Sequence, residues 1–424
     1  MKTYINTPRN EWAALVARSL PDDTAIEERV RGILSRVKEG GDKALRDITT
    51  EIDGSAPESF LVSWEEIEAA IGKVSEKVKA AVSEADTRIS SFHKLQIPRD
   101  AVLEVDGVKC VRKFLPIEKV GLYIPGGSAP LFSTILMLAL PAKLAGCREI
   151  TLCTPCGKDG SVAPEILYTA SFCGIDKIYK LGGAQAIGAM AYGTETVPKV
   201  SKIFGPGNRY VMKAKQIVSA SGTAIDMPAG PSEVMVLADS SARPEFVAAD
   251  LLSQAEHGPD SQVMLVATDK SIAAAVESEV AAQLALLPRG GIAEKALQNS
   301  RIIVFDNEDD IVDFANEYAA EHLIISMEDP WRIAGRITAA GSIFIGNYSP
   351  ESAGDYASGT NHTLPTMGLA TAFSGIGTDS FMHSVYYQEL TREGLGGLAS
   401  TIIDMAEAEG LQAHAAAVKI RLDK

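Results

Sequence analysis

Apolar residues near the N-terminus recur at every third or fourth position, which is the period of an amphipathic helix. They are Ile26, Val30, Ile33 and Val37. This period predicts a helix over 24–41 that ends at paired glycines. Further on, Ser63 and Glu66 have the spacing of a capping box, which predicts the start of a charged helical region running to about residue 96.

Short apolar runs separated by turn residues follow this helical part. Runs at 102–105 and 108–111 flank Asp106 and Gly107, which predicts a hairpin with a two-residue turn. Nine apolar strands then alternate with helical segments, as in α/β proteins with mostly parallel sheets. The predicted strands are 119–124, 149–153, 177–181, 202–204, 233–238, 262–267, 301–305, 322–325 and 342–345.

Nine strands are too many for one modest sheet, and a Pro/Gly-rich segment at 225–231 divides them into two groups. The sequence therefore predicts two α/β domains. A long Ser/Thr/Gly-rich region at 347–380 has no clear period, and stretches of this kind in compact proteins are usually functional. The last forty residues return to a helical pattern whose apolar positions, such as Leu398 and Ile402, need another surface to pack on.

Composition narrows the class of protein. The chain has 424 residues, of which 46% are hydrophobic, so it is long enough to bury real cores. Its net charge is -15 and no basic run is interleaved with aromatic residues, which argues against nucleic acid as a partner. No run resembles a signal peptide or is long enough to span a membrane, so we expect a cytoplasmic protein with no membrane partner.

The five cysteines are an odd number spread over a large chain, which argues against a disulfide framework. Cys153 and Cys156 form the one close pair, directly after a predicted strand. No second pair of cysteine or histidine stands at zinc-finger spacing, so buried or idle thiols are the favoured interpretation.

Polar residues suited to catalysis gather in the C-terminal half. Gln254 and His257 lie three residues apart, and therefore on one face, at the end of a helix that Pro244 opens and a Gly-Pro pair closes. The adjacent Glu321 and His322 are suited to moving protons near neutral pH. The whole constellation is Gln254, His257, Glu321, His322, Asp355, His362, Glu409 and His414.

Imidazole nitrogens with carboxylate or amide oxygens make a donor set that zinc accepts. Within the constellation the competent ligands are Gln254, His257, Asp355 and His414. A single histidine, taken alone, more often has a structural or surface role than a catalytic one. The clustering of these histidines in polar segments favours a functional site, whose reaction the residues do not identify. His93, isolated on a charged helix, and His383 are interpreted as surface residues.

Three predicted strands end in glycine-rich turns, at 124–130, 181–185 and 204–208. Turns at the carboxyl ends of parallel strands hold ligands in α/β proteins, and glycine lets a phosphate or ribose approach the backbone. The G-x-G-x-x-G fingerprint is absent from the sequence. Nucleotide-binding turns and ordinary tight strand-to-helix connections both remain open at this point.

Seven blocks of sequence, taken together, resemble one known family, histidinol dehydrogenase. They are 120–134, 182–187, 203–208, 226–233, 251–262, 321–324 and 349–362. The resemblance implies a zinc-dependent enzyme that oxidises L-histidinol to L-histidine through L-histidinal with two NAD, the final steps of histidine biosynthesis.

The resemblance also implies roles for individual residues. The zinc ligands would be Gln254, His257, Asp355 and His414. The proton-transfer residues would be Glu321 and His322. Substrate would be held by Ser232, Gln254, His257, His322, Asp355, Glu409 and His414, with His362 as an assisting contact. NAD would contact Tyr123, Gln185 and Asn208, which lie in the three glycine-rich turns.

The fold implied by the resemblance is α/β, with two incomplete Rossmann-like parallel-sheet domains plus small helical segments from both termini, in a homodimer with shared active sites. Residues 1–22 and 373–402 would be helical dimerisation segments. Residues 23–122 and 233–372 would form the first α/β domain with the catalytic loops, and 123–232 the second with the NAD-binding turns. The helical tail 403–424 would contribute to the partner's site.

Three other functions fit part of the pattern. A zinc hydrolase would use the same metal, carboxylate and histidine for water attack. A binding protein without activity would keep the ligands and lose the proton-transfer pair, yet Glu321 and His322 are both present. A paralogous NAD-dependent dehydrogenase would act on another small polar alcohol, such as a sulfonated diol. Glu409 favours histidinol, because a carboxylate suits a cationic amino alcohol and repels a sulfonate.

Overall fold

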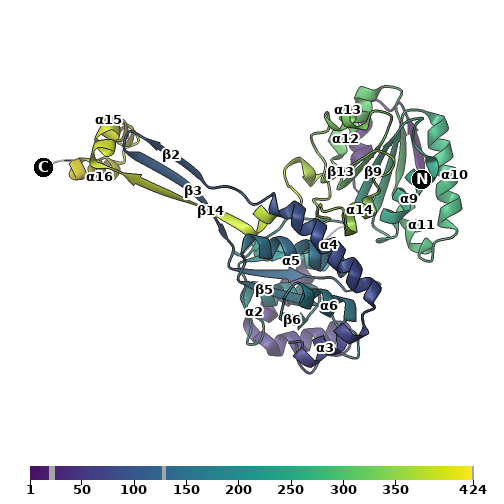
Figure 1. The fold of residues 1–424 in the computed structure, drawn as a ribbon, viewed down its shortest axis with the longest axis horizontal. Helices are drawn as coiled ribbons and strands as arrows, with labels where there is room; N and C mark the ends of the chain where they lie inside the picture. Colours follow the sequence, from purple (N-terminus) through teal and green to yellow (C-terminus); the bar gives the residue numbers. More distant parts are fainter. Residues whose placement is uncertain (19–23, 127–129, 423–424) are drawn as a thin grey trace.

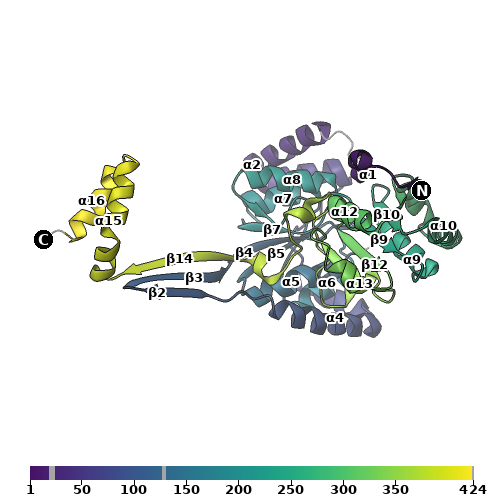
Figure 2. The same ribbon diagram turned by 90° about the horizontal axis from the view of Figure 1, so that it is seen from above.

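The computed structural model describes residues 1–18, 24–126 and 130–422. Two bodies, each built on a parallel sheet covered by helices, lie side by side, and a long antiparallel arm carries two further helices at its tip (Figures 1 and 2). The strands are β1 (Lys2–Ile5), β2 (Ala101–Val105), β3 (Val108–Pro116), β4 (Lys119–Tyr123), β5 (Glu149–Thr154), β6 (Lys177–Lys180), β7 (Lys202–Phe204), β8 (Ala224–Ile225), β9 (Glu233–Ala238), β10 (Gln262–Ala267), β11 (Arg301–Val304), β12 (His322–Ser326), β13 (Ser342–Ile345) and β14 (Met382–Leu390).

The helices are α1 (Trp12–Val16), α2 (Thr24–Asp53), α3 (Trp64–Lys73), α4 (Glu76–Lys94), α5 (Ser133–Ala145), α6 (Pro164–Phe172), α7 (Gly183–Tyr192), α8 (Arg209–Ala220), α9 (Pro244–Ala255), α10 (Lys270–Leu284), α11 (Gly290–Gln298), α12 (Glu308–Tyr318), α13 (Pro330–Ala334), α14 (Glu351–Tyr356), α15 (Arg392–Ala408) and α16 (Gln412–Leu422). Three short 3-10 turns lie at Arg9–Glu11, Leu369–Thr371 and Thr378–Phe381. The α/β fold class expected from the sequence is confirmed.

The first body is a six-stranded parallel sheet in the order β1-β11-β10-β9-β12-β13. Its central strands are apolar on both faces, as parallel strands between two helical layers must be. Val234 and Val236 of β9 face a cluster with α9, α10 and α11, whereas Met235 and Leu237 face a cluster with α1, α12 and α13. This alternation is the two-residue period of a strand.

The second body is a five-stranded parallel sheet in the order β6-β5-β4-β7-β8. Helices α3, α4, α5 and α6 join the core on one face, and α2, α7 and α8 join the core on the other. The structure thereby corrects the expected division of the chain, because 24–94 pack on this sheet and not on the six-stranded one. The reason is the apolar stripe of α2, where Val30, Leu34 and Val37 meet Ile187 of α7 and Val211 of α8.

The arm is a three-stranded antiparallel sheet in the order β14-β3-β2. The predicted hairpin is confirmed, since Asp106 (φ 50°) and Gly107 (φ 75°) both adopt the positive φ that a two-residue turn of this kind requires. Strand β14 lies in 373–402, which was expected to be helical, and that expectation is wrong for Met382–Leu390. The strand forms because it pairs along its whole length with β3.

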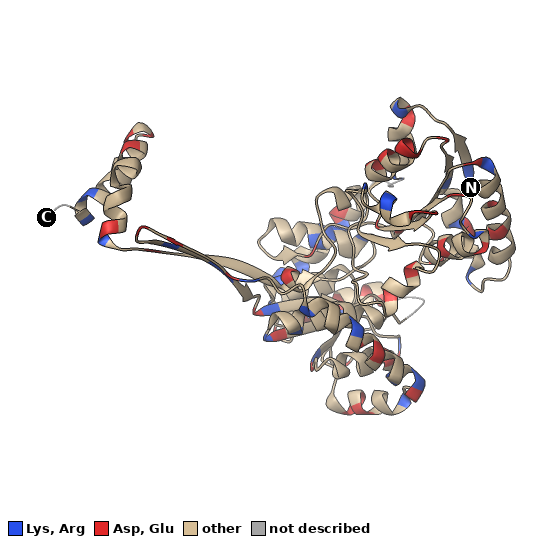
Figure 3. Cartoon of the chain, turned by 45° about the horizontal axis from the view of Figure 1, so that its top comes forward, with Lys and Arg blue, Asp and Glu red and all other residues tan. Residues whose placement is uncertain are grey.

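Beyond the arm, α15 and α16 lie against each other at its tip, far from both bodies (Figures 1 and 2). Residues 1–22 are also not purely helical, because β1 adds a parallel edge strand next to β11. Figure 3 shows acidic and basic residues interspersed on the helices of both bodies and on the arm. None of the described helices is both long and apolar enough to cross a membrane.

Most predicted elements are confirmed. All nine predicted strands are present within a residue at either end, and the capping box at Ser63 and Glu66 opens α3. The helix predicted over 24–41 continues to Asp53 through a break at Gly41, where φ is 52°. The cysteines are free, and burial raises the pKa of the Cys153 thiol, which agrees with an idle thiol.

Candidate functional site

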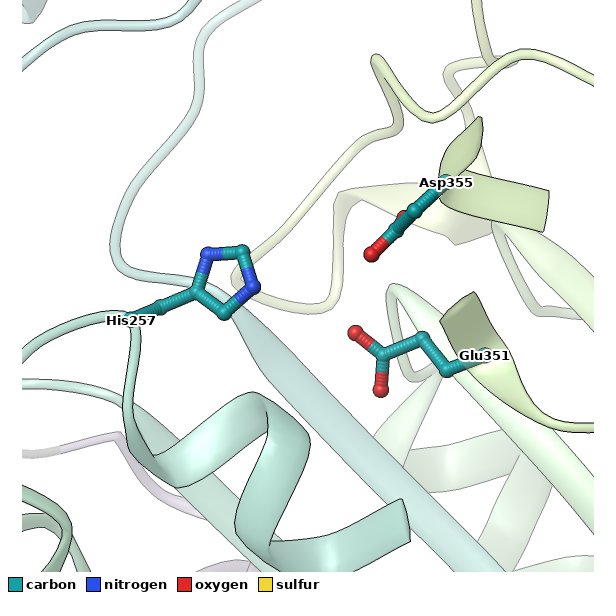
Figure 4. A group of neighbouring side chains, drawn as sticks. All are labelled: His257, Glu351 and Asp355. Carbon is teal, nitrogen blue, oxygen red and sulfur yellow. The ribbon is translucent and has the colours of Figure 1, made fainter. Parts of the chain in front are cut away.

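Three side chains from two segments converge near the surface of the six-stranded body. One nitrogen of His257 and one carboxylate oxygen each of Glu351 and Asp355 all lie within 4.8 Å of one another (Figure 4). Glu351 and Asp355 are four residues apart on α14, and so share one face of that helix. The exposed His257 follows the end of α9. Imidazole and carboxylate donors at this spacing fit a divalent ion such as zinc.

Gln254 reaches the same cluster from within α9, where it is fully buried. One orientation of the Gln254 side-chain amide gives hydrogen bonds to both its nitrogen and its oxygen. In that orientation the nitrogen donates to the Glu351 carboxylate, and the oxygen accepts from the backbone amide of Glu233 at 3.2 Å. The structure thus places Gln254, His257 and Asp355 together as predicted. The sequence analysis missed Glu351, whose signal was its position one helical turn before Asp355.

Glu321 and His322 lie side by side at the amino end of β12, and both are held by one residue, Glu233. The amide of Glu233 donates to Oε2 of Glu321 at 2.8 Å. Its carbonyl oxygen lies 3.2 Å from Nδ1 of His322. Since a carbonyl oxygen only accepts, Nδ1 carries the proton and Nε2 has a free lone pair.

The Nε2 atom of His322 has no hydrogen-bond partner among the described residues, although it is buried. It lies 3.8 Å from Oδ1 of Asp355, on the side of the metal-binding cluster. Burial lowers the pKa of His322 to about 3, so the ring is neutral and Nε2 keeps its lone pair. This geometry is that of a general base aimed at the cluster.

Burial also shifts the carboxylic acids of the site. It raises the pKa of Glu321 and of Glu351 well above the usual range, and that of Asp355 to about 7. Repulsion from Asp355 raises the pKa of Glu351 further. A divalent cation between these groups would offset both effects, because it favours their ionised forms. The residues present therefore fit a metal ion.

His362 connects the cluster to the other body. Its Nδ1 lies 2.9 Å from the carbonyl oxygen of Asp355, and its Nε2 lies 3.2 Å from Oγ1 of Thr134 on α5. The neighbouring Asn361 donates to the Met137 carbonyl oxygen at 2.6 Å and lies 3.2 Å from Nε2 of His93.

The expectation that His93 is a surface residue is wrong. The side chain is 0% exposed, because Asn361, 268 residues further along the chain, supplies the partner that its sequence neighbours do not. His383, by contrast, is exposed on β14 as expected.

Residues from all three glycine-rich turns line a cavity of about 710 Å³ in the five-stranded body, and positions 127–129 of the first turn lie outside the described residues. Tyr123, Gln185 and Asn208 all line it. The Tyr123 hydroxyl accepts from the Gly183 amide at 3.0 Å, and Asn208 caps α8. Residues at the N-termini of α7 and α8 are among the lining residues, and helix N-termini favour phosphate groups. The buried Gln185 Oε1 has no partner among the described residues and so offers an acceptor.

The other predicted residues are divided between the body and the tail. Ser232 is half-buried next to Glu233. Glu409, directly after α15, and His414, on α16, are exposed; both helices lie at the far end of the arm from the cluster (Figures 1 and 2). Within one chain the structure does not bring these two residues to the others.

Comparison with known proteins places the chain in a family. The family model described as histidinol dehydrogenase matches residues 16–422. Histidinol dehydrogenase of Bacteroides thetaiotaomicron is 51% identical over 424 residues, covering 100% of this chain and 99% of that one. The enzyme of Aliivibrio fischeri is 52% identical over 409 residues, covering 96% and 92%. The crystal structure of histidinol dehydrogenase from Elizabethkingia anophelis has a TM-score of 0.97 and 52% identity, covering 100% of this chain and 98% of that one. The chain therefore belongs to the histidinol dehydrogenase family.

Proposed function

We propose that this protein oxidises L-histidinol to L-histidine through L-histidinal, using two NAD and one zinc ion per subunit, as the final steps of histidine biosynthesis in the cytoplasm. The observation that carries the proposal is the free Nε2 of His322, which lies 3.8 Å from Oδ1 of Asp355, a member of the cluster with His257 and Glu351. A base beside a metal-binding cluster is what the removal of an alcohol proton requires.

In the first oxidation, the hydrogen on the alcohol carbon leaves as a hydride to NAD, and Nε2 of His322 takes the hydroxyl proton, which gives the aldehyde. Water then adds to the aldehyde, and the hydrate loses a second hydride to a second NAD and a hydroxyl proton to Nε2 of His322, which gives the acid. Glu321 is the group suited to activating that water, because burial raises its pKa and so makes its carboxylate a stronger base.

Zinc would be held by Gln254, His257 and Asp355, with His414 as a further ligand, and when bound it would act as a Lewis acid on the substrate. The Glu351 carboxylate orients Gln254 by accepting a hydrogen bond from the side-chain amide nitrogen of Gln254. Ser232 and Glu409 complete the substrate contacts. Tyr123, Gln185 and Asn208 hold NAD in the cavity of the five-stranded body.

The test of the function is NADH formation from histidinol and NAD, followed by absorbance with and without a chelator. We expect turnover that the chelator abolishes while the helical circular dichroism stays, since the proposed ligands hold a site rather than the fold. NADH formed from a sulfonated diol but not from histidinol would show that the substrate is wrong. Full activity in the metal-free protein would rule out the role of zinc.

We also propose a homodimer in which the tip helices of one subunit complete the site of the other. Support comes from the distance between the tail and the cluster within one chain, and from exposed apolar residues on the tip helices, such as Leu398, Met405 and Leu411.

The shared site can be tested with two inactive variants, Asp355→Ala and His414→Ala, unfolded together and refolded as an equal mixture. Random pairing makes half of the dimers mixed, and each mixed dimer has one intact site, so about a quarter of wild-type activity should return. A mixture that contains verified heterodimers but is no more active than its parents would contradict the shared site.

A further inference from the structure

Glu233 is the residue that orients both proton-transfer side chains. It is the first residue of β9, and the pairing of β9 with β12 starts one residue later, where Val234 lies opposite His322. The amide and carbonyl of Glu233 therefore lie beyond the ladder, and the side chains of Glu321 and His322 take them as partners. Rotation of the two peptide groups that flank the Cα atom of Glu233 would displace the hydrogen-bond partners of both catalytic side chains.

The Glu233 side chain is itself fixed by a buried ion pair with Arg18. Nε of Arg18 lies 2.9 Å from Oε1 of Glu233, and Nη2 lies 2.8 Å from Oε2, which is a two-pronged contact. The two side chains are only 11% and 1% exposed. The amide of Met367 donates to Oε1 at 2.9 Å, so the carboxylate has partners on both oxygens.

Arg18 also holds the segment that leads into Glu321 and His322. Its Nη2 donates to the carbonyl oxygen of Tyr318 at 2.6 Å, and its guanidinium lies 3.8 Å from the centre of the Tyr318 ring. Tyr318 is the last residue of α12, three positions before Glu321. The Arg18 guanidinium therefore links the start of β9, which orients Glu321 and His322, to the end of α12, which precedes these two residues in the chain.

We propose that Arg18 and Glu233 are positioning residues for proton transfer, an inference that rests on the proposed oxidation of histidinol. Neither side chain belongs to the metal-binding cluster or lines the cofactor cavity. Loss of Arg18 leaves a buried carboxylate without its cation, and Glu233 then moves toward water and turns its peptide. Displacement of about 1 Å at reacting groups costs up to about 100-fold in rate.

The matched control is Arg9, which lies in the same N-terminal segment and also contacts α12. It pairs with Asp310 and Asp313 at the surface, where its side chain is 60% exposed. Replacing Arg9 changes how the N-terminal segment docks on α12, but leaves Glu233 untouched. Arg9→Ala and Arg18→Ala are therefore compared in the same full-length enzyme.

For Arg18→Ala we expect kcat to fall by about 10- to 100-fold while KM for NAD stays within about twofold, and guanidinium salt at millimolar concentration to restore part of kcat. For Arg9→Ala we expect neither a fall nor a rescue. Equal losses of kcat in the two variants, or an unchanged kcat in folded Arg18→Ala, would overturn the proposal. If Arg18→Ala does not fold, Glu233→Gln replaces it, with a smaller loss of kcat expected and an unchanged kcat counting against the proposal.

Hydrogen exchange separates this inference from the proposed function. If the wild-type enzyme made no NADH from histidinol, the proposed function would be wrong. The positioning role would still be tested by the exchange rates of the backbone amides near Glu233 and Glu321. Arg18→Ala should speed exchange over 231–234 and 319–322 and leave the five-stranded body unchanged, because the Glu233 amide loses its fixed position against Glu321. Unchanged exchange in both segments would refute it.

Discussion

Lys215 and Asp226 form a buried ion pair that encloses the third glycine-rich turn. Their charged atoms lie 2.5 Å apart, and each side chain is 1% exposed. Nζ of Lys215 donates to the carbonyl oxygen of Gly205 at 2.7 Å, and Oδ2 of Asp226 accepts from the Gly205 amide at 2.8 Å. The pair thus contacts Gly205 on both sides, three residues before Asn208.

The change Lys215→Met removes the ammonium group and leaves the Asp226 carboxylate buried with two amide donors, from Gly205 and Met227, but without its ion-pair partner. Breaking a buried pair in this way costs about 3–5 kcal/mol of unfolding free energy. By comparison, the pair of Arg36 and Glu51 is 44% and 58% exposed, so Arg36→Met should cost at most about 1 kcal/mol.

Urea denaturation of both variants and of Lys215→Met/Asp226→Asn measures these differences. The double variant should be less destabilised than the sum of its single variants by about 2 kcal/mol or more, because the uncompensated charge disappears. KM for NAD should rise for Lys215→Met, since the turn that leads to Asn208 loses a contact. A cost for Lys215→Met no larger than that for Arg36→Met, or additive effects of the single changes, would contradict a stabilising buried pair.

Three further outcomes follow from the same geometry. Glu321→Gln should impair oxidation of histidinal more than oxidation of histidinol, whereas His322→Asn should slow both; equal losses for Glu321→Gln in the two half-reactions would contradict this division. Gly205→Ala should raise KM for NAD and destabilise the protein, because φ is +122° and an added Cβ would meet the Tyr123 carbonyl oxygen at 2.1 Å; an unchanged KM would count against it. His383→Ala should change stability by no more than about 0.5 kcal/mol, measured by thermal unfolding, because the side chain is exposed.

The nine strands predicted for the two parallel sheets all have apolar residues on at least one buried face. Strand β1 was missed because it is four residues long and its partner, β11, lies about 300 residues away. Strand β14 was missed because both of its faces are largely exposed, so its side chains show no alternation of apolar and polar residues. Pairing with β3, which no local pattern encodes, is what makes it a strand.

Prediction of the site residues was limited in the same way, because contacts between residues distant in sequence leave no local pattern. His257 and Asp355 were predicted from residue chemistry and the resemblance, and the structure places them together. Glu233 carried no prediction although it ends one of the matching blocks, because its role is carried by its backbone and by Arg18, 215 residues earlier. His93 was misjudged for the same reason, since its partner Asn361 is distant in sequence.

The two half-sites lie at opposite strand ends, Tyr123 at the carboxyl end of β4 and His322 at the amino end of β12. In the proposed reaction the substrate and NAD must come within hydride-transfer distance, which constrains how the two bodies are placed. The segment after Asp355 supplies that constraint, because His362 contacts α5 and Phe381 stacks on Phe204 at 3.9 Å. Asp355 thus enters the cluster from a segment that is anchored in the five-stranded body, so one stretch of chain positions both the candidate metal cluster and the cavity proposed to hold NAD.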